Sequence, residues 1–314
     1  MLGSIRDAVQ GEKNARPALF GLPAPGRLLV NSAQGAWVVQ RDGSKRLLAG
    51  YRDASWSPHG LYVAAIHGDE LRAIKPSGDR RWSIGRPNLA SPRWSSFGQQ
   101  DERVAYLSGK TLRVIDGNGT DDRLLARRVM AVAPAWKPGT HVVTYFDAAG
   151  EVRAIDVDSR RQRWRTTLFA AQPILLAWSD DGTRLLAATS SELAIIDGEG
   201  KVLSMRATGG RPEAASFAPG SHRFALLRWL THQRRNGVEV IDADRLERRR
   251  QIFAGAGTFG AVSWSPTGRW LILDWDSADQ WLFIRSAAVR KLVAVSDIEE
   301  NFGLDASPTG WCCP

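Results

Sequence analysis

The chain has 314 residues, of which 43% are hydrophobic and 24% are charged, so it carries enough apolar side chains for a large buried core. Its 42 Lys and Arg outnumber its 33 Asp and Glu, which gives a formal net charge of +9. Basic surfaces attract nucleic acid and anionic lipid, but these basic residues are spread along the whole chain and favour neither partner.

The first residues, Met1 to Pro17, contain no apolar run that could span a bilayer or form the core of an export signal. We expect residues 1–25 to be a helical or disordered lead-in and residues 26–314 to form a single domain. On this sequence we expect no membrane span.

An aromatic residue followed by a turn rich in Ser, Pro and Gly recurs six times, with the aromatic residues 38 to 47 positions apart. A period of about 40 residues, each with several short strands, is typical of the blades of a β-propeller. Five of the 13 Trp are such anchors, so we expect most Trp to pack between blades. The copies are Ser55–Gly60, Trp94–Gly98, Trp136–Gly139, Trp178–Gly182, Phe217–Gly220 and Trp264–Gly268, and a partial copy follows at Ser307–Trp311.

The pattern of one copy predicts a four-stranded blade between Ala54 and Ile84. Ser55–Ser57 is a short inner strand, and Leu61–Ile66 is an apolar run that suits a strand buried between neighbouring blades. Glu70–Ile74 alternates polar and apolar residues, as a half-buried strand does, and Arg80–Ile84 follows as the outer strand.

The two ends of the chain together supply one more blade. Arg27–Gly50 reads as a blade without an innermost strand, and Asp305–Trp311 reads as an innermost strand without a blade. We therefore predict an all-β, seven-bladed β-propeller of four-stranded blades, closed by a composite N- and C-terminal blade that leaves no free edge. A six-bladed ring is the alternative. We expect the protein to be monomeric.

The third strand of four blades ends on an aspartate. A short carboxylate at a strand end accepts backbone N–H groups of the following turn, whereas a ring of four such residues could also be imagined as metal ligands. Because each lies at the periphery of its own blade, we expect the turn role. The four are Asp116, Asp156, Asp197 and Asp242.

The repeat resembles that of TolB-type, WD-repeat-like propeller proteins over about residues 26–311. Within Pro25–Gly60, the segments Arg27–Val30, Trp37–Gln40 and Asp42–Leu48 also look like uncharacterised propeller proteins of actinobacteria. That second resemblance implies an extracytoplasmic domain behind a membrane anchor, which this sequence does not contain. Neither resemblance implies one function, because the repeat serves many unrelated proteins.

A local similarity concerns one tryptophan. Ala154–Ser159, followed by Trp164, is similar to the tryptophan-docking motif of quinoprotein-like propellers. It implies that Trp164 packs against a neighbouring blade. It does not imply a quinone, and we expect no cofactor.

No motif for catalysis, phosphate loops or metal binding is present. Gly117–Gly119 and Gly198–Gly200 are predicted as hairpin turns between strands. Cys312 and Cys313 are the only cysteines, which excludes a disulfide framework and a zinc site, and we expect free thiols. The histidines are scattered and form no predicted set: His59, His67, His141, His222 and His232.

The densest charge lies in the longest repeat. A predicted loop at Thr231–Asn236 lengthens that repeat, and long propeller loops often carry contacts. The arginines around and after it form a candidate interaction patch for an anionic or acidic partner, although charges on an outer strand also prevent edge pairing. The patch comprises Arg234, Arg235, Arg245, Arg248, Arg249 and Arg250.

The sequence thus favours a non-catalytic interaction scaffold that binds a protein or peptide. The alternative is a ligand-binding or hydrolytic propeller with a site at the central funnel, formed by residues that no linear motif reveals.

Overall fold

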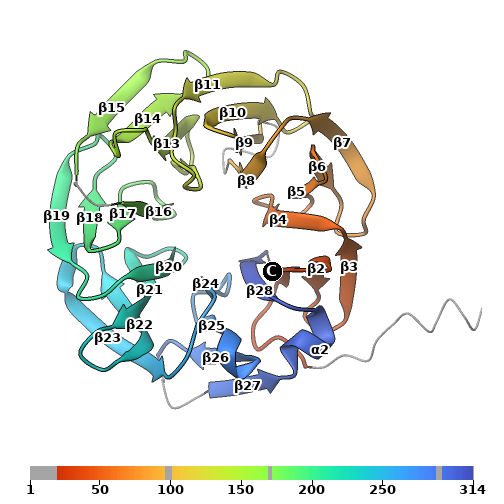
Figure 1. The fold of residues 1–314 in the computed structure, drawn as a ribbon, viewed down its shortest axis with the longest axis vertical. Helices are drawn as coiled ribbons and strands as arrows, with labels where there is room; N and C mark the ends of the chain where they lie inside the picture. The colour runs from red at the N-terminus through yellow and green to blue at the C-terminus, as the bar shows by residue number, and fades with distance from the viewer. Residues whose placement is uncertain (1–19, 96–100, 169–171, 288–291, 314) are drawn as a thin grey trace, which may run out of the picture.

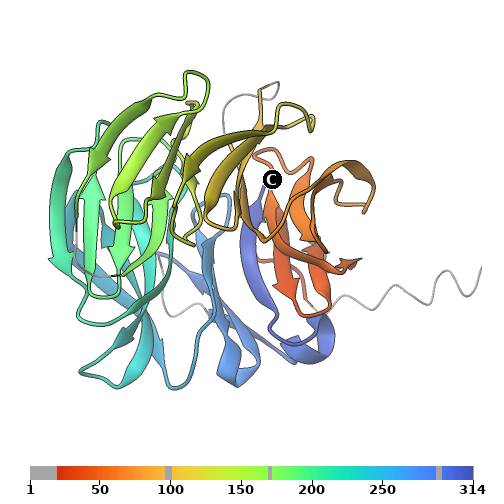
Figure 2. The same cartoon turned by 45° about the horizontal axis from the view of Figure 1, so that its top comes forward.

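The computed structural model describes residues 20–95, 101–168, 172–287 and 292–313. Seven four-stranded antiparallel sheets stand around a central axis as the blades of a propeller (Figures 1 and 2). The predicted fold class is confirmed, and the six-bladed alternative is wrong.

The blades are numbered in chain order. The first holds β1 (Arg27–Ser32), β2 (Gly35–Val39), β3 (Lys45–Ala49) and, from the far end of the chain, β28 (Ser307–Cys312). The second holds β4 (Tyr51–Trp56), β5 (Val63–His67), β6 (Glu70–Ile74) and β7 (Arg80–Gly85). The third holds β8 (Leu89–Trp94), β9 (Arg103–Ser108), β10 (Thr111–Asp116) and β11 (Arg123–Arg127). The fourth holds β12 (Ala135–Trp136), β13 (Val142–Phe146), β14 (Val152–Asp156) and β15 (Gln162–Thr166).

The remaining three blades follow in the same order. The fifth holds β16 (Pro173–Trp178), β17 (Leu185–Thr189), β18 (Glu192–Ile196) and β19 (Val202–Ala207). The sixth holds β20 (Pro212–Phe217), β21 (Arg223–Leu230), β22 (Arg235–Asp242) and β23 (Arg245–Gly255). The seventh holds β24 (Val262–Trp264), β25 (Trp270–Trp275), β26 (Gln280–Arg285) and β27 (Leu292–Ser296). A 3-10 turn, η1 (Asp276–Ala278), joins β25 to β26, and a short helix, α2 (Ile298–Phe302), joins β27 to β28.

The first blade is the predicted composite of the two chain ends. β28 pairs antiparallel with β1, with Leu28 opposite Trp311 and Asn31 opposite Ser307. The C-terminal strand β28 therefore occupies the inner position that residues 27–50 lack, in the same blade as β2 and β3 (Figure 1).

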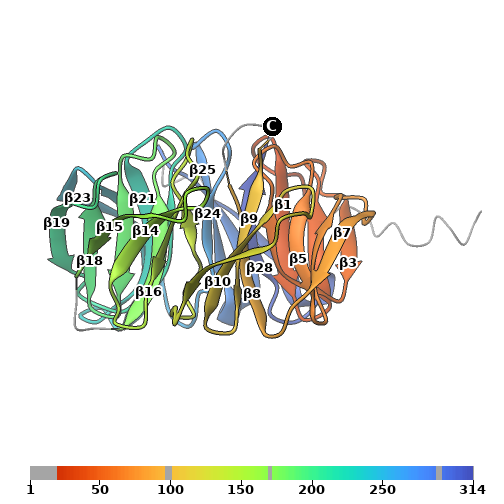
Figure 3. The ribbon, with the colours of Figure 1, turned by 90° about the horizontal axis from the view of Figure 1, so that it is seen from above.

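The two faces of the ring differ in the turns that they carry. Because successive strands are antiparallel, the first and third turns of every blade lie on the face where the chain ends, here named the C-terminal face (top of Figure 3). The second turn of each blade and the link to the next blade lie on the opposite face.

The aromatic anchors pack between neighbouring blades, as predicted. Trp136 and Trp264 are buried, and each donates its indole N–H to the inner strand of the preceding blade: to the Arg93 carbonyl at 2.8 Å and to the Ser216 carbonyl at 2.9 Å. At these two junctions, a bulky ring and one hydrogen bond hold adjacent inner strands in register.

Outer-strand tryptophans make a second set of contacts between blades. Trp164 donates its indole N–H to the Gly198 carbonyl of the next blade at 3.1 Å, and Trp82 donates likewise to the Gly117 carbonyl at 2.8 Å. A Cβ on Gly200 would lie 2.7 Å from the Trp164 ring, so only glycine allows this approach. The predictions for Trp164 and for both glycine hairpins are confirmed.

The aspartates at the ends of the third strands mostly support turns. Asp197 accepts the backbone N–H groups of Glu199 and Lys201, each at 2.9 Å. Asp156 and Asp242 accept backbone N–H groups of their own turns in the same way. Asp116 differs, because its carboxylate lies 3.7 Å from the Arg103 guanidinium.

The sixth blade departs from the prediction. Its β21 and β22 have 8 residues each and its β23 has 11, so the extra residues lengthen strands and only a tight turn joins β21 to β22. The predicted loop at Thr231–Asn236 is shorter than expected: residues 231–234 form the turn, whereas Arg235 and Asn236 belong to β22, because the β21–β22 ladder continues to the pair Leu230 and Arg235.

The two ends of the chain add two details. Residues 1–19 of the predicted lead-in lie outside the described residues, but Phe20 and Leu22 pack into the cluster around Trp281.

Cys312 and Cys313 form a vicinal disulfide beside the carbonyl of Pro58, so the expectation of free thiols is wrong. The end of β28 turns both sulfur atoms toward the same turn, which follows the inner strand β4. Within the described ranges, no helix is long and apolar enough to cross a membrane.

Candidate functional site

The structure divides the six predicted arginines between the two faces of the ring. Arg245 starts β23 on the C-terminal face, opposite Asp242, and Arg248–Arg250 follow along the same outer strand. Arg234 and Arg235 lie at the far end of β22, seven residues from Asp242 and thus roughly 20 Å away along the strand. The six do not form one patch.

The first of the two surfaces is a cleft of about 450 Å³, here named the arginine cleft. Arg250 donates to the Ser286 carbonyl of the seventh blade, which fixes one wall. The single carboxylate, Asp242, accepts the backbone N–H of Asp244 at 2.9 Å. The lining residues are Arg223, Val240, Asp242, Arg248, Arg249, Arg250, Ser286 and Ala287.

The guanidinium groups of this cleft carry uncompensated charge. Among the residues that the structure describes, no carboxylate lies within 4.0 Å of Arg223, Arg248, Arg249 or Arg250. The equivalent position of the fourth blade is different, because Arg163 there donates to the turn aspartate Asp156 at 2.7 Å.

The second surface is the end of the β21–β22 hairpin, residues 229–236, here named the hairpin tip. Trp229 is 38% exposed and lies opposite Asn236, while Arg235 lies opposite Leu230 at the end of the ladder and Arg234 belongs to the turn. The turn is anchored to its neighbours: Thr231 donates to the Gly209 carbonyl, and the Asn236 amide donates to the Gly257 carbonyl at 2.9 Å. An aromatic ring and two cations are thus held on a supported hairpin.

Two members of these surfaces were missed by sequence reasoning. Arg223 precedes the arginine run by more than twenty residues and enters the cleft only because β21 and β23 flank β22. Trp229 falls outside the anchor repeat and is exposed because β21 extends past the length of its counterparts. In the sequence around Arg223 and around Trp229, only the alternation of side chains along a strand indicates which residues face outward.

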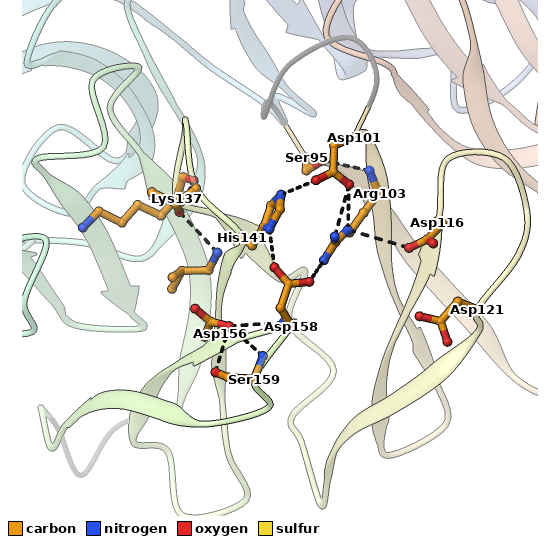
Figure 4. A network of polar contacts seen from close by, with 12 residues as sticks. Ser95, Asp101, Arg103, Asp116, Asp121, Lys137, His141, Asp156, Asp158 and Ser159 are labelled. Atoms are coloured by element: carbon orange, nitrogen blue, oxygen red, sulfur yellow. Dashed lines mark hydrogen bonds and ion pairs between the residues drawn. The ribbon is translucent and has the colours of Figure 1, made fainter.

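A network of polar contacts on the C-terminal face was also missed (Figure 4). His141, in the first turn of the fourth blade, lies between two carboxylates: its Nε2 is 2.9 Å from Asp101 of the third blade, and its Nδ1 faces Asp158 of its own blade. Arg103 contacts both aspartates from the third blade. The hydrogen bonds from Arg103 and His141 outweigh burial and lower the pKa of Asp158.

The same bridge joins the fifth and sixth blades. His222 Nε2 lies 2.8 Å from Asp181 of the fifth blade, and Nδ1 lies 2.7 Å from Asp244 of the sixth. Hydrogen bonds to Asp181 and Asp244 raise the pKa of His222, and the bond to His222 lowers the pKa of Asp244. His141 and His222 occupy equivalent turns, but each contacts its own pair of carboxylates, so they form two separate bridges rather than one set.

The imidazole nitrogens and carboxylates of these two bridges are groups that could act in acid–base catalysis, but here they contact one another. Each histidine has a carboxylate on both ring nitrogens, so neither nitrogen is open to a substrate. Over the described ranges, no three His, Cys, Asp or Glu side chains are grouped so that they could hold a metal ion.

Two polar side chains likewise join neighbouring blades, by accepting backbone N–H groups of inner strands. Asp53 accepts the backbone N–H of Ser91 at 2.6 Å, and Asn31 accepts that of Ala54 at 3.0 Å. Each links one blade to the next.

Comparisons with known proteins show the fold. No family model and no curated protein sequence matches the chain. Hsv2 of Kluyveromyces lactis is similar in structure, with a TM-score of 0.63 and 8% identity over 83% of this chain and 89% of that one. An Hsv2 variant with loop 6CD replaced by a Gly-Ser linker gives 0.63 and 9% over the same shares. A chain of the mitotic checkpoint complex gives 0.60 and 17% over 77% of this chain and 74% of that one. At such identities the likeness establishes a β-propeller and nothing more specific.

Proposed function

We propose that this protein is a non-catalytic interaction scaffold that binds a protein or peptide partner through the hairpin tip of the sixth blade. The observation that carries the proposal is the extension of this blade beyond the repeat, which leaves Trp229, Arg234 and Arg235 exposed at the end of one hairpin. Trp and Arg are the residues that most often dominate the binding energy of protein interfaces.

The support beneath the hairpin tip strengthens the proposal. Its turn is held by Thr231, Gln233 and Asn236, so little conformational entropy remains to be lost when a partner binds. The resemblance of the repeat to TolB-type and WD-repeat-like propellers agrees with an interaction role, and one of the similar structures belongs to a multi-protein complex.

Affinity capture with the full chain, from cells that contain it naturally, tests this role. We compare the parent with the double variant Arg234→Ser/Arg235→Ser and with Trp229→Ala. A matched control, Arg80→Ser/Arg81→Ser, removes two exposed arginines from β7 of the second blade. We expect recovery of the partner to fall about tenfold or more for both tip variants, since a central interface residue contributes roughly 2 kcal/mol or more.

The control decides the interpretation. Partners recovered equally with the parent and the control, but lost with the tip variants, support the proposal. Equal recovery with all four proteins, or equal loss with the control, contradicts it. The double arginine variant keeps the test valid if Trp229→Ala folds poorly.

A further inference from the structure

We infer that the arginine cleft is a binding site for a phosphate group, separate from the hairpin tip and on the opposite face of the ring. The phosphate is carried either by a small phosphate ester or by a phosphorylated peptide segment. The two sources share the chemistry that this cleft recognises.

The charges around the cleft favour an anion. Four arginines line a space that holds one carboxylate, Asp242, which is already bonded to the turn backbone. The nearby Asp244 is paired with His222 and with Arg184, at 2.7 Å in each case, so it does not compensate the arginines. An anion that enters the cleft gains attraction from several cations without displacing an existing ion pair.

The kind of cation favours phosphate. Guanidinium is planar, stays charged at any physiological pH and presents paired N–H donors that match two oxygens of a phosphate. All four cations here are arginines, from β21 and from β23, and thus approach the space from two strands of one blade. A volume of about 450 Å³ lies within the usual range for small-ligand sites.

Protection of a strand edge does not account for this arrangement. Charges that prevent edge pairing are needed on the outer strand, here β23. Arg223 lies on β21, which is paired on both sides by β20 and β22, so it protects no edge. In the fourth blade, moreover, the outer-strand Arg163 is neutralised by its turn aspartate, whereas Asp242 pairs with none of the cleft arginines.

Titration calorimetry with the full chain tests the site. The probes are inorganic phosphate, pyrophosphate, a phosphoserine peptide, the same peptide without phosphate, and acetate. The variants are Arg223→Ser/Arg248→Ser and Arg248→Lys, and the control is Arg80→Ser/Arg81→Ser, which removes the same charge from β7 of the second blade, outside both proposed sites.

We expect phosphate-bearing probes to bind the parent and the control alike. The double serine variant weakens binding at least about tenfold, as expected for the loss of charged hydrogen bonds, while its melting temperature stays that of the parent because both residues are exposed. Arg248→Lys keeps the charge but loses the paired donors, so its affinity falls between those of the parent and the double variant.

The remaining outcomes are equally decisive. A phosphoserine peptide that binds at least about tenfold more tightly than pyrophosphate identifies a protein segment as the source, and the reverse identifies a small ester. No heat with any phosphate probe, binding of acetate as tight as that of phosphate, or the same loss in the control overturns the inference. None of these results depends on the hairpin tip having a partner.

Discussion

The first and sixth blades depart from the repeat in opposite ways. The first has too few consecutive residues and borrows β28 from the far end of the chain, whereas the sixth has too many and extends β21, β22 and β23. The borrowed strand is held by buried apolar contacts, whereas the added length includes the exposed residues Trp229, Arg234 and Arg235. Closing the ring constrains the first blade, while the sixth is free to carry a surface that the architecture does not require.

The contacts of the first blade show what closure depends on. The Trp37 indole donates to the Phe302 carbonyl at 2.7 Å, and the two rings meet edge to face. Trp311 of β28 is buried against Phe283 of the seventh blade. β28 therefore joins the first blade to the seventh as well as completing the first.

Deletion of residues 303–314 should have the largest effect. It removes β28, exposes the inner edge of β1 and removes the buried side chain of Trp311. The loss of a buried Trp alone lowers the free energy of unfolding by roughly 3–5 kcal/mol. We expect the melting temperature, followed by circular dichroism, to fall by about 10 °C or more.

The matched comparison is Trp229→Ala in the sixth blade, where the same side chain is 38% exposed. It should lower the melting temperature by no more than a few degrees, since a partly exposed ring leaves little cavity. A deletion variant that melts like the parent would show that β28 does not close the ring.

The next effect concerns a buried carboxyl beside the closing strand. Asp274 of β25 is only 5% exposed, and burial raises its pKa to about 7. The charge of Asp276 also raises this pKa, whereas hydrogen bonds from Ser307 and Trp281 lower it. The unfolded chain, with an ordinary aspartate pKa, loses this proton near pH 4, so folding stability falls between pH 4 and 7 and levels off above.

Asp274→Asn should remove that part of the pH dependence. The pKa of Asp274 rises from about 3.8 in the unfolded chain to about 7 in the folded one, a difference of roughly three units. At about 1.4 kcal/mol per unit, this corresponds to up to about 4 kcal/mol of unfolding free energy. Relative to the parent, the variant should therefore gain stability toward pH 8 in urea unfolding. Parallel stability curves for the two proteins between pH 4.5 and 8 would mean that Asp274 keeps an ordinary pKa.

The sequence predicted the blades because each is specified locally. The aromatic anchor, its turn and the alternating third strand lie within one repeat. The sequence of Arg27–Gly50 also showed that this blade lacks an innermost strand of its own. The arginine cleft was not predictable, because Arg223 and Arg248 meet only through the register of three strands. At Thr231–Asn236 the polar composition suggested a six-residue loop, whereas only residues 231–234 form a turn and the ladder includes Arg235 and Asn236.

The histidine bridges had a signal that sequence reasoning missed. His141 and His222 each lie five residues after an anchor, at Trp136 and Phe217, and Asp158 and Asp244 each follow two residues after a strand-end aspartate. What no single repeat shows is that the second carboxylate comes from the preceding blade.

The smallest predicted effect is at His222, where a charged bridge joins the sixth blade to the fifth in addition to the apolar cluster between the two blades. Its raised pKa, caused by Asp181 and Asp244, means that the proton stabilises the folded state. That contribution is fully present below the ordinary histidine pKa of about 6.5 and is lost as the pH rises through the higher folded value.

His222→Gln should therefore cost up to about 1 kcal/mol of unfolding free energy at pH 6, as expected for a partly exposed ion pair, and close to nothing at pH 9. His232→Gln, at the exposed hairpin tip, is the control and should behave like the parent at both pH values. If His222→Gln loses the same stability at pH 6 and pH 9, the bridge acts through packing, and the sixth blade is joined to its neighbour in the way that the first blade is.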